Sequence, residues 1–351
     1  MEIDLLIHRL VKECEASELK QKLNNIKKEL DPEEFNNFLH FTRKFTTEDS
    51  HKFKYTVNPI LFYKYCTIEK IEVLIDFGLD INIKNFFGKN ALFYVDAKKS
   101  DFLLKKGIEK LDVPNNERRN ALFYCGLEKI KVLLSHGYDI NIKNVKEESI
   151  MFHAPDIDVV DFLITQGFSV NELNKSENNM IMGMALNEHL IKDLIDRGLN
   201  INHLNKKKQN ALFYASVKKI EVLLDSGINI HHRAKYETNC AFHSPYNCDK
   251  SLALKRLKLL KEAGVDLNIT DRLGKNIFRY LSSPDEIEFL ILEGVRPPDY
   301  NPAYLLSSDI KMFETIKEVQ RKIAIDKERE TLFNIIEDIP VNNDVKIMKR
   351  M

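Results

Sequence analysis

The stretch NALFYCGLEKIKVLLSHGYDINIKN, residues 120–144, contains the features from which the fold can be predicted. Its first five residues recur at a regular distance along the chain. The pentapeptide NALFY occupies 90–94, 120–124 and 210–214. The second copy therefore starts 30 residues after the first, and the third starts 90 residues after the second. A fixed period of this length is typical of repeat architectures, in which each repeat is one supersecondary unit.

A glycine that follows the apolar end of each repeat extends this period beyond the three pentapeptides. These glycines are Gly78, Gly107, Gly137, Gly167, Gly198, Gly227, Gly264 and Gly294. The intervals are 29, 30, 30, 31, 29, 37 and 30 residues, and the longest one contains an insertion of eight residues. The sequence thus predicts about eight repeats over residues 55–298, with a flank on each side, 1–54 and 299–351.

Each repeat is expected to form a helix–turn–helix followed by a loop. Asn120 is a good N-cap for a first helix that begins in the pentapeptide, because its side chain can accept from free N–H groups of the first turn. Ile130, Leu133 and Leu134 have helical spacing. Gly137 suits the left-handed position after a helix. The segment DINI (139–142) is expected to be extended and part of a short hairpin finger. No repeat is long enough to bury its own apolar stripe, so neighbours must stack.

These repeats resemble the ankyrin-repeat family. GKNALFY (88–94) stands where the family has G-x-T-P-L-H, and IEVLIDFGLDIN (71–82) is similar to the family's second helix and its G-A-D-I-N segment. The chain departs from the family in having Asn-Ala for Thr-Pro and about 30 residues per repeat instead of 33. The resemblance implies a mainly α, ankyrin-like solenoid with hairpin fingers. It also implies that one protein partner is held by the concave face and the finger tips.

Both flanks have helical patterns. Residues 1–54 include one or two amphipathic segments and then DPEEFNNFLHFTRKF (31–45), in which Pro32 is well placed in a first helical turn after Asp31. Residues 299–351 also look helical. We expect the two flanks to be helical caps on the open apolar ends of the array, which solenoids require. A separate functional module in one flank is the alternative.

Composition excludes several broad classes. Lys+Arg and Asp+Glu number 53 each, so a zero net charge gives no support for binding nucleic acid or a membrane surface. No apolar run approaches the length of a spanning helix, and the charged N-terminus lacks a signal peptide's apolar region. Five scattered cysteines, without a CxxC pair, indicate free thiols. The prediction is a cytoplasmic protein, or alternatively one secreted into a host cell without a cleavable signal.

The sequence contains few groups of residues that could bind a metal or catalyse a reaction. The densest set of potential ligands is His231, His232, Cys240, His243 and Cys248. A zinc site needs four converging ligands, whereas the period assigns Cys240 and His243 to the alanine and tyrosine positions of the pentapeptide. No nucleophile, base and orienting group stand together, and no phosphate-binding or metalloprotease motif occurs. We therefore predict no catalytic residue, no metal, no cofactor and no small-molecule substrate.

Variation between repeats points to partner binding. The tips between the extended pieces and the asparagine caps differ in sequence, and residues 151–200 carry 8 acidic side chains against 3 basic ones. An acidic patch would attract a basic partner, although a solvated face gives the same pattern. Exposed aromatic tips fit an interface, unless Phe86 or Phe87 folds back. The candidate partner-binding residues are Phe86, Phe87, Glu117, Arg118, Lys146, Asp156, Asp158, Glu177, Lys206, Lys207, Tyr236 and Arg272.

An array without recognisable catalytic chemistry is best interpreted as a non-enzymatic protein-binding module. Its most concrete version is a bacterial immunity protein that binds and neutralises a cognate toxin with a basic surface. The first alternative is a secreted bacterial effector that binds a host protein. A metal-dependent enzyme is the third interpretation, and it predicts bound metal or turnover.

Overall fold

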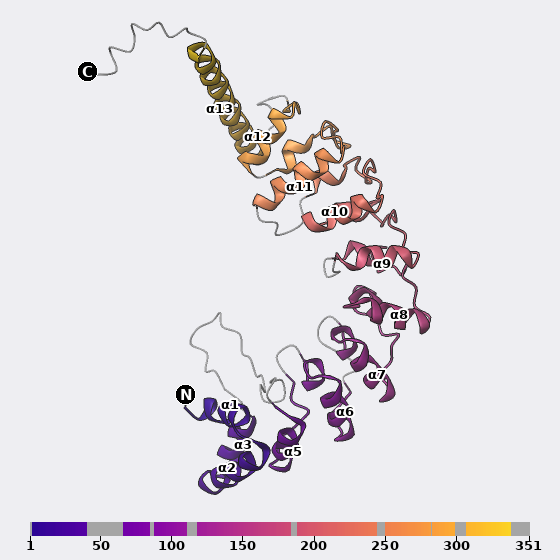
Figure 1. Ribbon diagram of the computed structural model, residues 1–351, viewed down its shortest axis with the longest axis vertical. Coiled ribbons are helices and arrows are strands. Elements are labelled where there is room, and N and C mark those ends of the chain that lie inside the picture. The colour runs from indigo at the N-terminus through magenta and orange to yellow at the C-terminus, as the bar shows by residue number, and fades with distance from the viewer. Residues whose placement is uncertain are drawn as a thin grey trace, which may run out of the picture. The chain divides into compact units, whose positions relative to one another are not determined.

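The protein is mainly helical in a computed structural model that describes residues 2–40, 66–84, 88–110, 118–183, 188–243, 250–281, 283–298 and 307–337 (Figure 1). Within these ranges there are twelve α-helices and no strand. The chain divides into two compact units, Met1–Leu199 and Asn200–Met351. We call them the N-terminal and the C-terminal unit and describe each by itself. The predicted mainly α class is confirmed.

In the N-terminal unit, α-helices alternate with short 3₁₀ turns, labelled η, after the first four helices. The elements are α1 (Glu2–Glu13), α2 (Ala16–Glu29), α3 (Pro32–His40), α5 (Ile68–Asp76), η1 (Ala91–Phe93), α6 (Ala97–Lys105), η2 (Ala121–Tyr124), α7 (Leu127–Ser135), η3 (Ile150–His153), α8 (Ile157–Thr165), η4 (Met180–Met182) and α9 (Leu190–Asp196).

The C-terminal unit continues the alternation and ends in a long helix, α13, which projects beyond α12 (Figure 1). Its elements are η5 (Ala211–Phe213), α10 (Val217–Asp225), η6 (Cys240–Phe242), α11 (Lys250–Glu262), η7 (Ile277–Tyr280), α12 (Pro284–Leu292) and α13 (Ser307–Glu337).

The pentapeptide does not begin an α-helix, which corrects the predicted helix–turn–helix repeat. It forms a single 3₁₀ turn, and the N-cap of the following helix comes only a few residues later. Asp96 already caps α6, its side chain accepting from the Lys99 N–H at 2.9 Å. Only five residues separate the caps Asn90 and Asp96, so a second α-helix of ordinary length has no room in a repeat of about 30 residues.

The predicted asparagine caps are confirmed. The Oδ1 of Asn90 accepts from the Leu92 N–H at 3.1 Å, and that of Asn210 accepts from the Leu212 N–H at 3.2 Å. The Nδ2 of Asn90 also donates to the Glu109 carbonyl at 3.0 Å. One buried side chain therefore satisfies backbone groups at the start of a repeat and after its helix.

The predicted left-handed glycines are also confirmed, at all eight positions. At Gly137, with φ +78°, the N–H bonds to the Leu134 carbonyl at 2.8 Å. The next N–H, from Tyr138, reaches back to the Leu133 carbonyl at 3.1 Å. This pair of bonds closes the helix end and turns the apolar residue after the glycine into the core. The bond from the residue after the glycine recurs in each repeat.

The core is built from the middle of the pentapeptide and one face of each helix. Ala91, Leu92 and Phe93 are buried, as are Ile130 and Leu133 of α7. The phenylalanine of one repeat meets the ring at the fifth pentapeptide position of the next repeat. The ring pairs and centroid distances are Phe93–Tyr124 at 5.6 Å, Phe123–His153 at 5.3 Å, Phe213–His243 at 5.1 Å and Phe242–Tyr280 at 5.2 Å. Neighbouring repeats thus complete each other's core.

The DINI segment is a turn and not the extended piece that the pattern predicted. Asp139 accepts from the Asn141 N–H at 2.9 Å, and this local hydrogen bond competes with an extended chain. Asparagine in this segment links repeats, because Asn82 accepts from the Glu109 N–H at 2.7 Å. Among the described residues the only bridged pair of strand type joins Thr270 to Asn276, so the hairpin fingers reduce to tight loops.

Both flanks are helical where the structure describes them. Asp31 caps α3 with bonds of 2.8 Å from two N–H groups, as expected for a Pro32 in the first turn. Lys70 of α5 donates to the Val11 carbonyl of α1 at 3.1 Å. At the other end, buried Phe313, Ile316 and Val319 show that the first half of α13 is packed. The boundaries predicted at 54 and 298 stay predictions.

Of the helices described, none combines the length and the apolar character needed to cross a bilayer. The four cysteines within the described ranges, Cys14, Cys66, Cys125 and Cys240, are free, as predicted. Burial raises the pKa of Cys66 to about 12, so this thiol stays protonated and acts as a core side chain.

Replacing Gly227 with alanine should lower the free energy of unfolding by about 1 kcal/mol, the cost of a left-handed backbone for a residue with a Cβ. The added methyl group meets no atom within 4 Å, so the backbone cost stands alone. Gly227→Asn should cost less, because asparagine tolerates this conformation. Urea unfolding followed by circular dichroism measures both variants, and equal losses would contradict the argument.

Candidate functional site

Five loops with one shared geometry form the candidate binding surface. We call them the tip loops; they are residues 144–148, 174–178, 205–209, 234–238 and 271–275. In the first one, the Asn144 Oδ1 accepts from the N–H groups of Lys146 and Glu148 at 2.8 and 3.0 Å, while the Asn144 N–H donates to the Glu148 carbonyl at 3.0 Å. This closed turn fixes the loop backbone and leaves the second to fourth residues exposed.

The fourth residue of each tip loop has a left-handed backbone. Gly274 occupies this position with φ +72°, but the other four loops place residues with a Cβ there. These residues are Glu147, Glu177, Lys208 and Glu237, with φ between 53° and 62°. Such positions cost of order 1 kcal/mol each and persist only where the surrounding structure holds them. The closed hydrogen bonds around each loop supply that constraint.

Adjacent tip loops are joined by backbone hydrogen bonds. In the N-terminal unit, the Lys175 N–H donates to the Lys146 carbonyl at 2.8 Å. In the C-terminal unit, Lys235 donates to Lys207 at 3.0 Å and Arg272 donates to Tyr236 at 2.9 Å. Within each unit, the second residue of one loop thus bonds to the third residue of the loop before it. Third-position side chains consequently form a row along the tips.

In the C-terminal unit this row borders a groove with a volume of about 610 Å³. Its lining residues are Lys207, Gln209, Ala234, Tyr236, Thr238, His243, Asp271, Arg272, Leu273 and Tyr280. The apolar part is exposed: the relative accessibility is 61% for Tyr236, 76% for Leu273 and 44% for Tyr280. A groove of this size, apolar with a few polar groups, is typical of a ligand site.

The acidic side chain of the groove is hydrogen-bonded within the described part of the protein, whereas two of its basic side chains are not. Tyr280 donates its hydroxyl to the Asp271 Oδ2 at 2.6 Å, and burial together with this carboxylate raises the pKa of Tyr280 to about 12. Burial, followed by Arg256 and Lys207, lowers the pKa of His243. The side chains of Lys207 and Arg272 form no ion pair or hydrogen bond with any residue that the structure describes. Positive charge is therefore available at the groove, whereas the negative charge of Asp271 is used internally.

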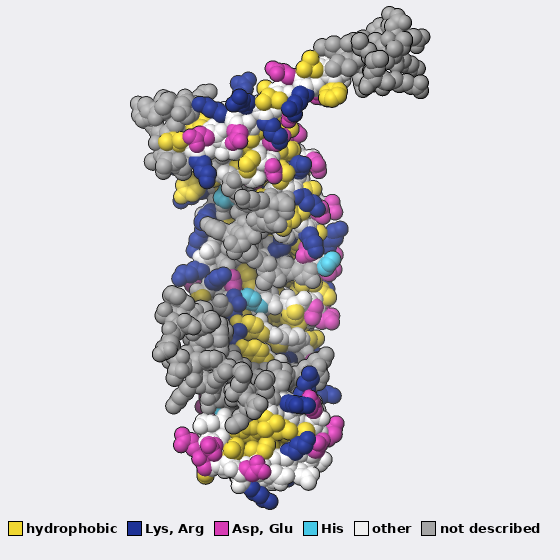
Figure 2. Space-filling model, turned by 90° about the vertical axis from the view of Figure 1, so that its left-hand side faces the viewer, with side chains coloured by type: hydrophobic (Ala, Val, Ile, Leu, Met, Phe, Trp, Pro, Cys, Tyr) yellow, Lys and Arg dark blue, Asp and Glu magenta, His cyan; other side chains and the backbone are white. Residues whose placement is uncertain are grey.

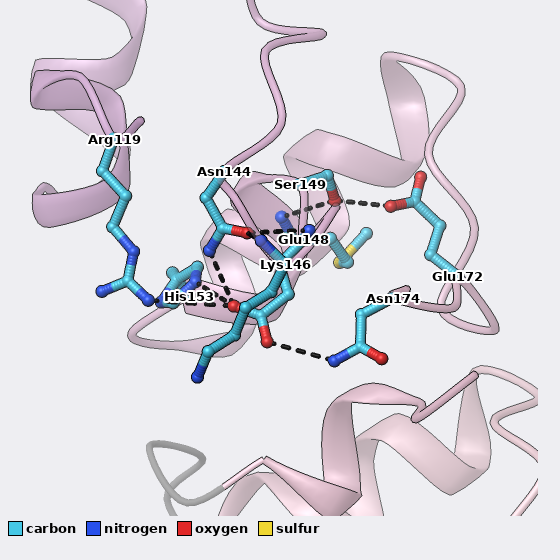
Figure 3. Close-up of polar contacts among 9 residues, drawn as sticks. Arg119, Asn144, Lys146, Glu148, Ser149, His153, Glu172 and Asn174 are labelled. Carbon is cyan, nitrogen blue, oxygen red and sulfur yellow. Dashed lines mark hydrogen bonds and ion pairs between the residues drawn. The ribbon is translucent and has the colours of Figure 1, made fainter. Parts of the chain in front are cut away.

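Glu148 holds together a polar cluster at the tip loops of the N-terminal unit (Figure 3). Its Oε2 accepts from Asn144 at 2.7 Å and contacts His153 at 3.2 Å, and its Oε1 accepts from Asn174 of the next loop at 3.2 Å. Burial alone would raise the pKa of Glu148, but these hydrogen bonds outweigh burial and lower the pKa to about 2. Because both oxygens are engaged, this carboxylate joins the loops.

A second, more acidic groove lies in the N-terminal unit at the starts of the helices, with a volume of about 690 Å³. Exposed Tyr94 and Tyr124 contribute to its lining, together with the carboxylates of Asp96, Glu128 and Asp158. On the face shown in Figure 2, Lys and Arg side chains are interspersed with Asp and Glu. An excess of one sign of charge is therefore found at individual grooves, whereas the face in Figure 2 carries both signs throughout.

Most of the predicted partner-binding residues are exposed. Lys146, Glu177, Lys206, Lys207, Tyr236 and Arg272 lie on tip loops, and Arg118 has the same left-handed backbone as their fourth residues. Asp156 and Asp158 lie apart from the tips at the start of α8, where Asp156 accepts from the Val159 N–H at 3.0 Å. Phe86, Phe87 and Glu117 lie outside the described residues.

The groove brings together three of the predicted residues, Lys207, Tyr236 and Arg272, and adds two that sequence reasoning missed. Leu273 is the third residue of its loop, equivalent to Lys207 and Tyr236, so aligning the tips by position would have found it. Tyr280 occupies the fifth pentapeptide position, to which the sequence analysis assigns no binding role. Its side chain instead reaches the loop before it.

Where the structure describes them, the His and Cys residues considered as potential zinc ligands do not come together. Cys240 is buried in η6, where burial raises its pKa to about 11. His243 packs on Phe213, and His232 is paired with the Lys208 carbonyl at 2.7 Å. Cys248 is outside the described residues. In the part of the chain described, no three His, Cys, Asp or Glu side chains gather as metal ligands would.

Lys208→Gly should raise the free energy of unfolding by about 0.5–1 kcal/mol, because glycine removes the cost of φ +53°. The adjacent Lys207→Gly is the matched control. It should lower stability by a similar amount, since glycine there only adds freedom to the unfolded chain. The urea concentrations at the unfolding midpoints of the two variants are compared with that of the wild type. A loss of stability for both variants would contradict backbone strain at Lys208.

Acid should destabilise the N-terminal unit through Glu148. Its pKa is about 2 in the folded chain against an ordinary 4.5, so its contribution is present above about pH 4.5 and is lost as the pH falls toward 2. Glu148→Gln should melt at a lower temperature at pH 7 and show a smaller further decrease between pH 4.5 and 2.5. The exposed neighbour change Glu147→Gln should follow the wild type. Parallel curves for wild type and Glu148→Gln would refute the assignment.

Comparison with known proteins adds no family or function to this geometry. No protein-family model matches the chain, and no curated protein is significantly similar to it in sequence.

Proposed function

We propose that this chain is an ankyrin-like repeat protein and acts as a non-enzymatic protein-binding module through its tip loops. The observation that carries the proposal is the row of exposed Lys207, Tyr236 and Leu273, held on hydrogen-bonded loops beside a groove. A rigid backbone with variable side chains is the arrangement that recognition surfaces need, because little freedom is lost on binding.

The apolar members of the row support a protein partner. Leu273 and Tyr236 expose most of their surface to solvent, and neighbouring exposed apolar groups are characteristic of interaction sites. Aromatic and arginine side chains dominate the energy of many protein interfaces. Tyr236 and Arg272 supply both types at one groove.

In its most concrete form, the partner is a toxin that this chain neutralises by covering its surface. The acidic groove of the N-terminal unit favours a partner with a basic surface patch. Its Asp96, Glu128 and Asp158 would attract that patch and speed the partner's approach. The groove of the C-terminal unit would supply the apolar anchor. Each groove would contribute separately to affinity.

The decisive test is binding to a purified partner candidate, the product of the gene adjacent to the one that encodes this chain. We expect a Kd in the nanomolar range, loss of the candidate's activity on binding, and at least tenfold weaker binding by Tyr236→Ala combined with Leu273→Ala. Lys98→Ala on the exposed side of α6 is a control that should bind as wild type. Calorimetry measures the affinities.

Two outcomes would count against this assignment. If the adjacent product does not bind, the neutralisation role fails. If a partner binds equally well to the double variant, the tip row is not the binding surface. Delivery of a tagged copy into host cells would instead favour the secreted effector.

A further inference from the structure

The groove of the C-terminal unit has features that specify the chemistry of what it binds. We infer that it takes a segment of the partner protein in which an apolar side chain is flanked by carboxylates. This inference rests on the proposed function and names the chemistry of one contact. Three features of the groove support it: the apolar lining, the basic side chains, and the backbone carbonyls that are already hydrogen-bonded between loops.

The apolar requirement follows from the groove's middle. Leu273 and Tyr236 stand at the third position of adjacent loops, and Tyr280 and Ala234 complete the apolar lining. Burying Leu273, now 76% exposed, and Tyr236, now 61% exposed, would remove apolar surface from water, which favours binding. A polar side chain there would lose its hydration without compensation.

The carboxylates follow from the charges around that middle. The three tip loops of this unit contain six basic residues against two acidic ones: Lys206, Lys207, Lys208, Lys235, Arg272 and Lys275 against Glu237 and Asp271. Asp271 is hydrogen-bonded to Tyr280 and to two backbone N–H groups of its own loop. The two described tip loops of the N-terminal unit contain two basic and three acidic residues, so the basic excess is local to the groove.

Side chains rather than backbone must provide the recognition. The carbonyl groups of Lys207 and Tyr236 already accept from the next loop. The groove therefore offers no unpaired edge at these residues for adding a strand. Lys207 and Arg272 remain as side-chain donors near the apolar middle, and arginine binds a carboxylate with two parallel hydrogen bonds. A lysine-rich segment would meet like charge here, which disfavours it.

Selection from random peptides tests this chemistry without assuming a partner. The full chain is immobilised and exposed to phage-displayed random 12-residue peptides at 50 mM salt. Enriched peptides should carry Leu, Ile, Phe or Trp with Asp or Glu within two positions. A fluorescein-labelled synthetic copy of the most enriched peptide then reports affinity by polarisation. We expect binding that weakens at 300 mM salt, because exposed charge pairs are screened.

Variants assign the binding to the groove. Leu273→Asp should weaken binding of the labelled peptide at least tenfold. Lys207→Glu combined with Arg272→Glu should weaken it by a similar factor. The charge-reversed double variant should bind better to a copy of the peptide with lysine in place of each acidic residue. Lys98→Glu on the exposed side of α6 lies outside the tip loops and both grooves, so this control should bind the labelled peptide as wild type does. Circular dichroism melting checks that each variant is folded.

Several results would overturn the inference. They are no enrichment, enrichment without an acidic bias, unchanged binding by Leu273→Asp, and competition by oligo(dT), which would assign the groove to nucleic acid. The proposed function fails separately. If the adjacent gene product binds but tolerates every groove variant, protein binding stands and this inference falls. If the peptides behave as expected and that product does not bind, the inference stands and the neutralisation role falls.

Discussion

A buried asparagine at the start of the pentapeptide constrains three of the repeats, at Asn90, Asn210 and Asn239. Its Oδ1 caps the 3₁₀ turn while its Nδ2 holds a carbonyl beyond the following helix, so one side chain sets the distance between the two ends of the repeat. Asn90 reaches Glu109 and Asn210 reaches Asn229, each 19 residues along. Asn239 makes the same bond to Asp266, 27 residues along, because the eight inserted residues lie between them. The insertion leaves the connection intact, which shows that the bond and not the chain length is preserved.

Stacking depends on contacts that cross from one repeat to the next, and some of them use buried charge. Lys129 in α7 donates to the Val95 carbonyl at 2.6 Å, and Arg256 in α11 reaches the carbonyls of Leu212 and Cys240 at 2.9 Å each. Burial lowers the pKa of Lys129, and its hydrogen bond to Val95 partly offsets the desolvation cost. The carbonyls of Val95, Leu212 and Cys240, which lie in or just after 3₁₀ turns, need donors, and Lys129 and Arg256 supply them.

The same regularity explains why the tips suit recognition. Their backbone bonds repeat from loop to loop, while the side chains at the third position vary among Lys146, Ser176, Lys207, Tyr236 and Leu273. A fixed backbone with variable side chains separates the scaffold from the specificity. The two compact units use this freedom differently. One ties its loops together through Glu148, and the other opens an apolar groove with basic side chains.

The sequence by itself determined the period, the helical class, the asparagine caps and the left-handed glycines, because each depends on local backbone chemistry within a few residues. It also placed Lys207, Tyr236 and Arg272 at exposed tips. Only the tertiary structure decided that the pentapeptide forms a 3₁₀ turn, since helix length there depends on the room left before the next cap. The groove likewise depends on tertiary contacts, because Leu273, Tyr280 and Lys207 line one groove only when consecutive repeats stack and their loops bond side by side. Periodicity indicates which residues are equivalent, whereas contact between repeats decides which of them share a surface.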